Sequence, residues 1–291
     1  MKQKDFLIHI HVYYTGMWPE LRGYLSSLPE GTDYDLWVTY VKNDSKFLQD
    51  VRTTAPTAHI LKVENKGYDI GPFVEVLRRI EVDDYKYIIK LHSKRDVKGL
   101  VYPHIGLTEV SGDKWRHYLL SFMSGENFGK CLAAFEQNPR LGMVGHHALI
   151  CRKELADDRA WQESMKWIAD YGLQVSEPSY VAGSMFICRS RLMKLVKEVL
   201  SQESFERPVH EHSSTISHSV ERFLGHAVAA QGMLIEDVYT SKADKVRLVL
   251  IGVLQRCLYL TCRFFYQKKI TSNGRLIVKI CKIPVCFKRC R

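Results

Sequence analysis

The feature that most constrains the fold of this chain is an alternation of strand-like and helix-like segments along its first 91 residues. The strand-like runs are short and rich in aromatic and β-branched residues, and the segments between them show helical spacing. A helix between two strands returns the chain to the start of the sheet, so successive strands run in the same direction. The pattern therefore predicts an α/β fold with a mostly parallel sheet flanked by helices. The predicted strands are Phe6–Tyr14, Tyr34–Val41, His59–Val63 and Tyr85–Leu91, separated by helices at Trp18–Leu28, Ser45–Thr54 and Phe73–Ile80.

Charge divides the chain near residue 244. The segment from Lys245 to Arg291 holds 12 of the 42 lysines and arginines and none of the 32 acidic residues. Residues 1–244 therefore carry 30 basic and 32 acidic side chains, a net charge of −2, although the whole chain has a net charge of +10. The pattern predicts a nearly neutral body, residues 1–244, and a basic tail, residues 245–291.

Cysteine and histidine patterns do not indicate a metal site or a disulfide framework. Five of the eight cysteines lie in the tail, without the paired spacing of a zinc site. His9 and His11 share one face of the first strand, where metal binding and simple packing are both open and packing is the more common outcome. The first strand also lacks the features of a cleaved signal segment, so we expect an unprocessed cytoplasmic protein.

Polar loops follow the predicted third and fourth strands, at the edge where an open parallel sheet binds ligands. The first loop, Asn65–Pro72, has two glycines that allow close backbone approach and hydrogen-bonding side chains at Asn65 and Asp69. A polar turn before a helix is the alternative. The second loop, Lys90–Asp96, gathers two lysines, a histidine and an arginine that can neutralise a diphosphate leaving group. Charged runs are more commonly solvated surface.

A third feature lies further along the chain. Gly183 and Ser184 lead into an apolar, strand-like run that ends at Cys188, and a later helical segment carries His218, Glu221 and Arg222 on neighbouring turns. A carboxylate on such a helix face can act as a general base, but a surface ion pair is the more common role. Spacing by itself leaves both roles open.

Taken together, these segments resemble the rhamnan synthesis protein F family of bacterial polysaccharide glycosyltransferases. The resemblance extends from about His9 to Gly232 and preserves the order and spacing of the motifs. It implies a variant of the GT-A glycosyltransferase fold, in which a Rossmann-like half, residues 1–110, binds a nucleotide sugar and residues 111–244 receive the acceptor. The motifs that carry it are ENKGYDIGPF at Glu64–Phe73, KLHSK at Lys90–Lys94, GDKWRHYLL at Gly112–Leu120, GSMF at Gly183–Phe186 and HSVERF at His218–Phe223.

The resemblance also implies a donor site that differs from the usual one. GT-A enzymes commonly carry Asp-x-Asp after the fourth strand, and its carboxylates hold Mg²⁺ or Mn²⁺ on the diphosphate. This chain has His92, Ser93 and Lys94 there, and a lysine cannot ligate a hard cation. We therefore expect no metal ligands and expect Lys94, assisted by His92 or Arg95, to screen the phosphates, while Mg²⁺ or Mn²⁺ stays open as a cofactor. The implied donor contacts are Asn65, Gly67, Asp69, Gly71, His92, Lys94 and Arg95.

A general base and an acceptor site are implied in the second half. GT-A enzymes place a Glu-Asp pair about eleven residues before a glycine, and here Glu221 and Arg222 stand at that distance from Gly232. The glutamate fits, whereas arginine replaces the residue often assigned as base, so Asp113 and Glu211 are competing candidates. With Lys94, the catalytic candidates are thus Glu221 and Asp113. The implied acceptor contacts are Trp115, Arg116, Gly183, Ser184, His218 and Arg222.

The tail has the pattern of an amphipathic helix on a membrane surface. Residues Val246–Tyr266 are strongly apolar, and Gly252, Arg256, Arg263 and Gln267 fall near one helical stripe. A spanning helix would place Arg256 near the bilayer centre at a cost of about 2.5–3.5 kcal/mol, which an interfacial helix avoids. Basic residues near an anionic leaflet add about 1 kcal/mol each. We expect peripheral attachment to the inner face of the cell membrane; packing on the body is the alternative, and no motif indicates nucleic-acid binding.

The sequence thus favours an enzyme that transfers a sugar from a nucleotide-sugar donor to a lipid-linked surface polysaccharide. The family name suggests rhamnose as that sugar. A non-catalytic subunit that binds a nucleotide sugar or a polysaccharide is the alternative, because the Asp-x-Asp pair is missing.

Overall fold

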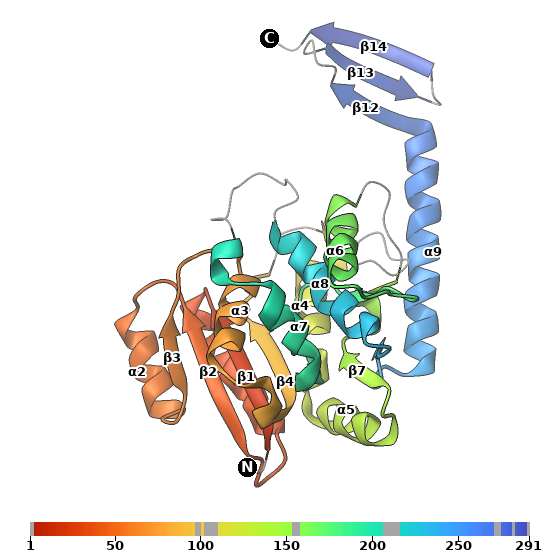
Figure 1. Cartoon of the computed structure of the whole chain (residues 1–291). Coiled ribbons are helices and arrows are strands. Elements are labelled where there is room, and N and C mark those ends of the chain that lie inside the picture. The colour runs from red at the N-terminus through yellow and green to blue at the C-terminus, as the bar shows by residue number, and fades with distance from the viewer. Residues whose placement is uncertain are drawn as a thin grey trace.

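A seven-stranded sheet forms the centre of the protein (Figure 1). The computed structural model describes residues 3–96, 100–101, 110–152, 158–205, 216–270, 275–280 and 283–289. The strands lie in the order β11-β7-β10-β4-β1-β2-β3, so the first strands of the chain fill one side of the sheet. Their bounds are β1 Lys4–Val12, β2 Tyr34–Tyr40, β3 His59–Lys62, β4 Tyr85–His92, β7 Leu141–Val144, β10 Phe186–Arg189 and β11 Leu234–Glu236.

The direction of the strands decides which loops meet. β1 runs parallel to β2 and β4, and β2 runs parallel to β3. β10 runs antiparallel to both β4 and β7, and β11 runs parallel to β7. The predicted mostly parallel sheet is confirmed. The reversal of β10 places its amino end beside the carboxyl ends of its neighbours.

Helices cover both faces of this sheet (Figure 1). Successive side chains of a strand point to opposite faces, and β1 shows both environments. His9 stacks on Phe73 of α3 with 5.6 Å between ring centroids, whereas Phe6 contacts Phe128 of α5 at 5.7 Å. The helices are α1 Trp18–Gly23, α2 Ser45–Thr54, α3 Ile70–Arg79, α4 Gly112–Leu120, α5 Gly125–Gln137, α6 Arg159–Asp170, α7 Lys194–Val199 and α8 Ile216–Ala230, and the short strands are β5 Leu100–Val101, β6 Val110–Ser111, β8 Ile150–Cys151 and β9 Tyr180–Val181.

One buried layer beneath α3 is polar. The hydroxyl oxygen of Thr39 lies 2.9 Å from His9 Nε2 and 2.9 Å from His11 Nδ1. Lys90 and His92 continue this layer, because His9 pairs with Lys90 and His11 with His92 in the sheet register. All five side chains are at most 6% exposed. Burial disfavours protonation, so it lowers the pKa of His9 and His92 well below the ordinary value and that of His11 to about 4.

The C-terminal region extends away from the body as a long helix followed by a small sheet (Figure 1). The helix is α9, Lys242–Phe265, and the antiparallel sheet consists of β12 Tyr266–Ile270, β13 Arg275–Ile280 and β14 Ile283–Arg289. The sequence analysis anticipated the helix but not the strands. Isoleucine and valine in the segment RLIVKI of β13 favour extended backbone, which agrees with its position in the sheet.

We expect acid to destabilise the protein below about pH 6.5. The buried histidines stay neutral in the folded protein, whereas in the unfolded chain they bind protons near pH 6.5. Their contribution to stability is complete above that pH and declines as the pH falls toward the folded pKa values. The loss is up to about 1.4 kcal/mol per pH unit for each such histidine. Urea unfolding midpoints measured from about pH 7.5 to 5 should fall steadily as the pH is lowered. Most carboxylates titrate below this pH range, so the change reports on the histidines.

The variant His11→Gln provides the comparison, because it keeps a hydrogen-bonding side chain near Thr39 and removes one titrating group. Its unfolding free energy should depend on pH less steeply, by the equivalent of one proton. Equal slopes in the two proteins, or a midpoint that does not move with pH, would show that these histidines are not held neutral.

Candidate functional site

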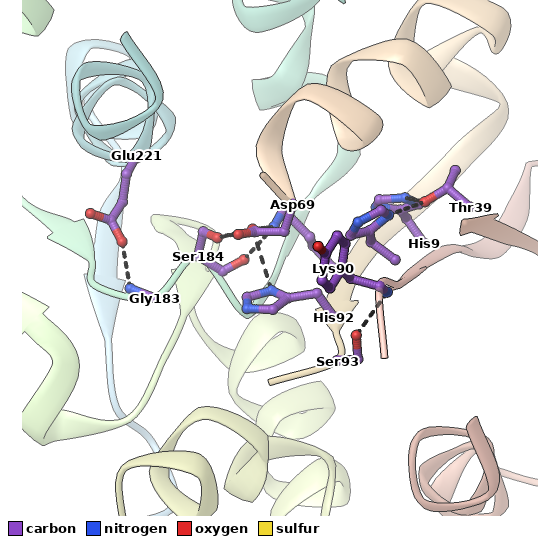
Figure 2. Close-up of polar contacts among 11 residues, drawn as sticks. His9, Thr39, Asp69, Lys90, His92, Ser93, Gly183, Ser184 and Glu221 are labelled. Atoms are coloured by element: carbon purple, nitrogen blue, oxygen red, sulfur yellow. Dashed lines mark hydrogen bonds and ion pairs between the residues drawn. The ribbon is translucent and has the colours of Figure 1, made fainter. Parts of the chain in front are cut away.

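Loops from both halves of the body meet at the edge of the sheet where β1 to β4 end and β10 begins. Figure 2 shows Asp69, from the loop before α3, facing Ser184, from the loop before β10. Lys90 and His92, from the end of β4, point toward the same place. This edge is where open α/β sheets bind ligands.

Lys90 joins the two loops. Its ammonium group donates to Asp69 Oδ2 at 2.5 Å, to the backbone oxygen of Ser184 at 2.9 Å and to Ser184 Oγ at 3.0 Å. Ser184 Oγ donates to Asp69 Oδ2 at 2.5 Å, and His92 Nδ1 lies 3.3 Å from the same oxygen. An ammonium group has three donors, so the contacts of Lys90 use its full capacity. We refer to Asp69, Lys90, His92 and Ser184 as the Lys90 cluster.

Opposite charges are buried together in this cluster. Burial by itself would raise the pKa of Asp69, but the charge of Lys90 and the hydrogen bonds that the carboxylate accepts from Lys90 and Ser184 lower it far below its usual value. Burial lowers the pKa of Lys90, and the carboxylate of Asp69 opposes that shift. The pair is therefore ionised, and removing one partner would leave a buried charge at a cost of about 3–5 kcal/mol. Asp69, expected to contact a ligand, has one carboxylate oxygen committed to these protein contacts.

Both loops contain left-handed turns. Gly67 and Tyr68 have φ angles of 70° and 54°, and Gly183 and Ser184 have φ angles of 81° and 50°. For tyrosine and serine this conformation costs about 1–2 kcal/mol each. Such strain persists where surrounding contacts fix the backbone, and it concentrates at functional sites. Tyr68 is also 40% exposed, so the first turn presents an aromatic ring at this edge.

The shape of these loops depends on glycines with no room for a side chain. Protein atoms occupy the space that a side chain would need at Gly67 and Gly71, so packing alone requires these glycines, and their predicted contact with a ligand stays a prediction. Asn65, at the start of this loop, is half-buried. A Cβ atom would lie 2.5 Å from the Phe205 ring at Gly67, 2.1 Å from the Lys66 carbonyl oxygen at Gly71 and 2.4 Å from Leu119 at Gly183.

Glu221 supports the second turn from α8. Its Oε1 accepts the backbone N–H of Gly183 at 2.6 Å, and its Oε2 lies 2.9 Å from Arg222 Nη1 (Figure 2 shows the first contact). Arg222 also contacts Asp158 at 3.2 Å. Both carboxylate oxygens of Glu221 are thus engaged, which suits a positioning role better than a free base. His218 lies exposed on the same helix.

Two cations lie over aromatic rings at the same edge. Lys94 Nζ is 5.4 Å from the centre of the Trp115 ring, and the Arg95 guanidinium is 4.3 Å from that of Tyr14. Within the part of the chain that the structure describes, neither cation lies within ion-pair distance of a carboxylate. Ring faces attract cations without neutralising them, so both charges stay available to an anion. The contact with Trp115 also brings together a predicted donor residue and a predicted acceptor residue.

Helix α4 contributes the other predicted residues. Arg116 is not free, because it pairs with Glu20 at 2.9 Å and with Asp96 at 3.0 Å. Asp113 is exposed in the first turn of α4, and a hydrogen bond from Ser111 lowers its pKa. Glu211, the other base candidate, lies outside the described residues.

The side chains after β4 do not fit a divalent cation. Ser93 Oγ accepts the backbone N–H groups of Tyr13 and Tyr14 at 2.8 and 2.9 Å, and Lys94 carries a positive charge. His92 is buried against Asp69. Among the described residues, no group of three or more His, Cys, Asp and Glu side chains has the arrangement of a metal site. Cations of the protein itself, rather than metal ligands, line this edge.

Sequence reasoning missed several residues of the site. Lys90 was placed in a charged loop, yet it is 0% exposed within β4. A signal was present, because a lysine inside the apolar run YIIKLH must find a buried partner. Lys42, which lies 5.5 Å from the centre of the Tyr13 ring, had no such signal.

Curated proteins with a similar sequence are two versions of the uncharacterized protein WxcX, from two strains of Xanthomonas campestris pv. campestris. Each is 24% identical to this chain over 185 residues, which cover 62% of the chain. The match spans about a quarter of the length of these relatives, 25% in each case.

Solved structures with a related arrangement include S. aureus TarS, with a TM-score of 0.42 and 12% identity over 89% of this chain and 73% of that one. Another is glucosyl-3-phosphoglycerate synthase from Mycobacterium tuberculosis in complex with Mn²⁺, UDP and glucosyl-3-phosphoglycerate. Its TM-score is 0.33, with 10% identity over 98% of this chain and 90% of that one. Both scores are too low to support an inference about function.

The family comparison covers most of the body. The model of rhamnan synthesis protein F matches residues 1–233, a range that contains both loops of the Lys90 cluster and all of β1 to β4, β7 and β10. The resemblance seen in the sequence motifs is thereby confirmed, and the chain belongs to the rhamnan synthesis protein F family.

Proposed function

We propose that this chain is a glycosyltransferase that moves a sugar from a nucleotide-sugar donor to a lipid-linked polysaccharide acceptor. Family membership supports the proposal, and the observation that carries it is the pair of cations, Lys94 and Arg95, at the ligand-binding edge of the sheet. In this proposal residues 1–110 bind the donor, with rhamnose as the first candidate sugar, and residues 111–244 bind the acceptor.

Each part of the site has a chemical task in this reaction. An acceptor hydroxyl attacks the anomeric carbon of the donor sugar, and the bond from that carbon to the diphosphate oxygen breaks. Lys94 and Arg95 stabilise the negative charge that develops on the departing diphosphate. A carboxylate takes the proton of the acceptor hydroxyl. Glu221 and Asp113 are the two candidates for this step; both carboxylates accept hydrogen bonds from the protein, and Asp113 is the exposed one.

A transfer assay tests the proposal. The protein, supplied with bacterial membranes that carry the lipid-linked acceptor and with radiolabelled dTDP-rhamnose or another nucleotide sugar, should transfer the labelled sugar to lipid and release nucleoside diphosphate. This transfer should persist in EDTA because cations of the protein replace a metal. Lys94→Ala should lower turnover by about 10²-fold or more, the usual loss for one electrostatic contact in a transition state. The exposed Lys130→Ala on α5 is the matched control.

Different results separate the alternatives. Activity abolished by EDTA and restored by Mn²⁺ would contradict the role of Lys94 in place of a metal. Nucleotide sugars that raise the melting temperature but are never turned over would favour a non-catalytic binding subunit instead.

We also propose that the chain works at the inner face of the cell membrane, attached through α9. The side of α9 near the body includes the buried Gly252 and the partly buried Leu248. The outward side is apolar: Leu250, Leu254 and Leu258 are 58%, 64% and 64% exposed. An exposed apolar side of a helix is stabilised by contact with another apolar surface, and lipid acyl chains provide such a surface.

The charge of the tail favours a lipid surface over a second copy of the tail as the contact for this apolar side. The segment from Lys245 onward carries 12 basic and no acidic residues, which attracts anionic headgroups and opposes the pairing of two such tails. No helix among the described residues has the length and apolar character needed to span a bilayer. A helix lying in the interface agrees with both observations.

Vesicle sedimentation tests this attachment. The full chain should pellet with vesicles that contain phosphatidylglycerol, less with pure phosphatidylcholine, and less at high salt. Leu254→Glu combined with Leu258→Glu should abolish pelleting. Gln49→Glu combined with Gln137→Glu adds the same charge on α2 and α5 and should leave most of the binding. Equal pelleting of the two double variants would contradict insertion of α9.

A further inference from the structure

We propose that Lys90 is a positioning residue that locks the two strained turns of the site to each other. The inference rests on the proposed function, since it assigns one turn to the donor side and the other to the acceptor side. In this proposal Lys90 fixes the position of the donor-side turn relative to the acceptor-side turn. Lys90 itself contacts no substrate, because its three donors are already used within the protein.

The topology of the sheet brings the two turns together. Asp69 and Ser184 are 115 residues apart in the chain and belong to different halves of the body. They face each other because β10 runs antiparallel to β4, with Phe186 opposite Lys90 in the register. A hydrogen bond from Lys90 to each residue therefore crosses from one half to the other through a side chain fixed in the sheet.

Each loop has two successive left-handed residues, one of them not glycine, and the Lys90 cluster holds each turn at or beside that residue. Ser184 is bound through both its hydroxyl and its backbone oxygen, and Asp69 directly follows Tyr68. Backbone in this conformation relaxes unless its surroundings hold it. Lys90 contacts both turns at once, and it reinforces the direct hydrogen bond from Ser184 Oγ to Asp69.

A buried ion pair is a weak source of stability, because apolar side chains of similar volume often do as well or better. Its presence beneath the site therefore calls for a role other than stability. Precise geometry is such a role, since a displacement of about 1 Å between reacting groups can cost on the order of 10²-fold in rate.

The test separates geometry from stability with three variants. Lys90→Met leaves Asp69 buried without its partner and should lower the melting temperature. Adding Asp69→Leu removes the uncompensated charge, so the double variant should recover most of that loss. Ser164→Ala is the control, because it breaks a buried hydrogen bond to His226 between α6 and α8, away from the cluster.

Hydrogen exchange provides a readout that needs no activity. The amide of Gly71 bonds to the carbonyl of Gly67 at 3.1 Å, and the amide of Ser184 bonds to that of Val181 at 3.2 Å. In the Lys90→Met, Asp69→Leu double variant both amides should exchange at least about tenfold faster than in the wild type, despite the recovered melting temperature. The Ser164→Ala variant should keep both rates.

Turnover provides the second readout. The double variant should lose at least about tenfold in kcat although it is folded. Wild-type exchange at either turn, or wild-type kcat in the double variant, would overturn the positioning role. If the wild type itself transfers no sugar, the proposed function fails, and the exchange rates still decide whether Lys90 locks the turns.

Discussion

The contact between the Lys90 ammonium and the Asp69 carboxylate is the constraint on which the rest of the site depends. The ammonium is removed from water at the end of β4, whereas the Asp69 side chain is 20% exposed. The buried charge therefore needs this carboxylate, and each of its remaining donors needs an acceptor. Ser184 supplies those acceptors from the loop before β10, a strand that runs antiparallel to β4. The reversal of β10, a property of the sheet, thus decides the chemistry of the site.

Around this pair, some residues fix the backbone, and others leave a charge available to a ligand. Glu221 and Ser93 fix the backbone by accepting hydrogen bonds from backbone N–H groups. The glycines of both loops allow the backbone shape because they have no side chain. Lys94 and Arg95 remain available, each resting on an aromatic ring. A site with unpaired cations above a fixed backbone suits an anionic ligand.

Buried polar side chains continue from Lys90 into the core as the layer under α3. Thr39 sits between two histidines that burial keeps neutral, next to the ionised Lys90. This layer joins adjacent strands through the Thr39 hydroxyl, while His9 Nδ1 and His11 Nε2 have no hydrogen-bond partner among the described residues. It gives the carboxyl ends of β1, β2 and β4 one common support. In contrast, α9 leaves the body with apolar side chains exposed along one side.

The sequence by itself determined the parallel part of the sheet, the family and the positions of the important loops. Those features follow from local periodicity and from motifs such as ENKGYDIGPF, which a linear pattern records directly. The antiparallel β10, the burial of Lys90 and the engagement of both Glu221 oxygens were decided only by the tertiary structure. Each of them depends on contacts between residues far apart in the chain, as Asp69 and Ser184 are, and single-sequence spacing does not encode which distant side chains become neighbours. The tail shows the same limit: apolar periodicity indicated α9, whereas which side of it faces the body emerged only from the packing of Leu248 and Gly252.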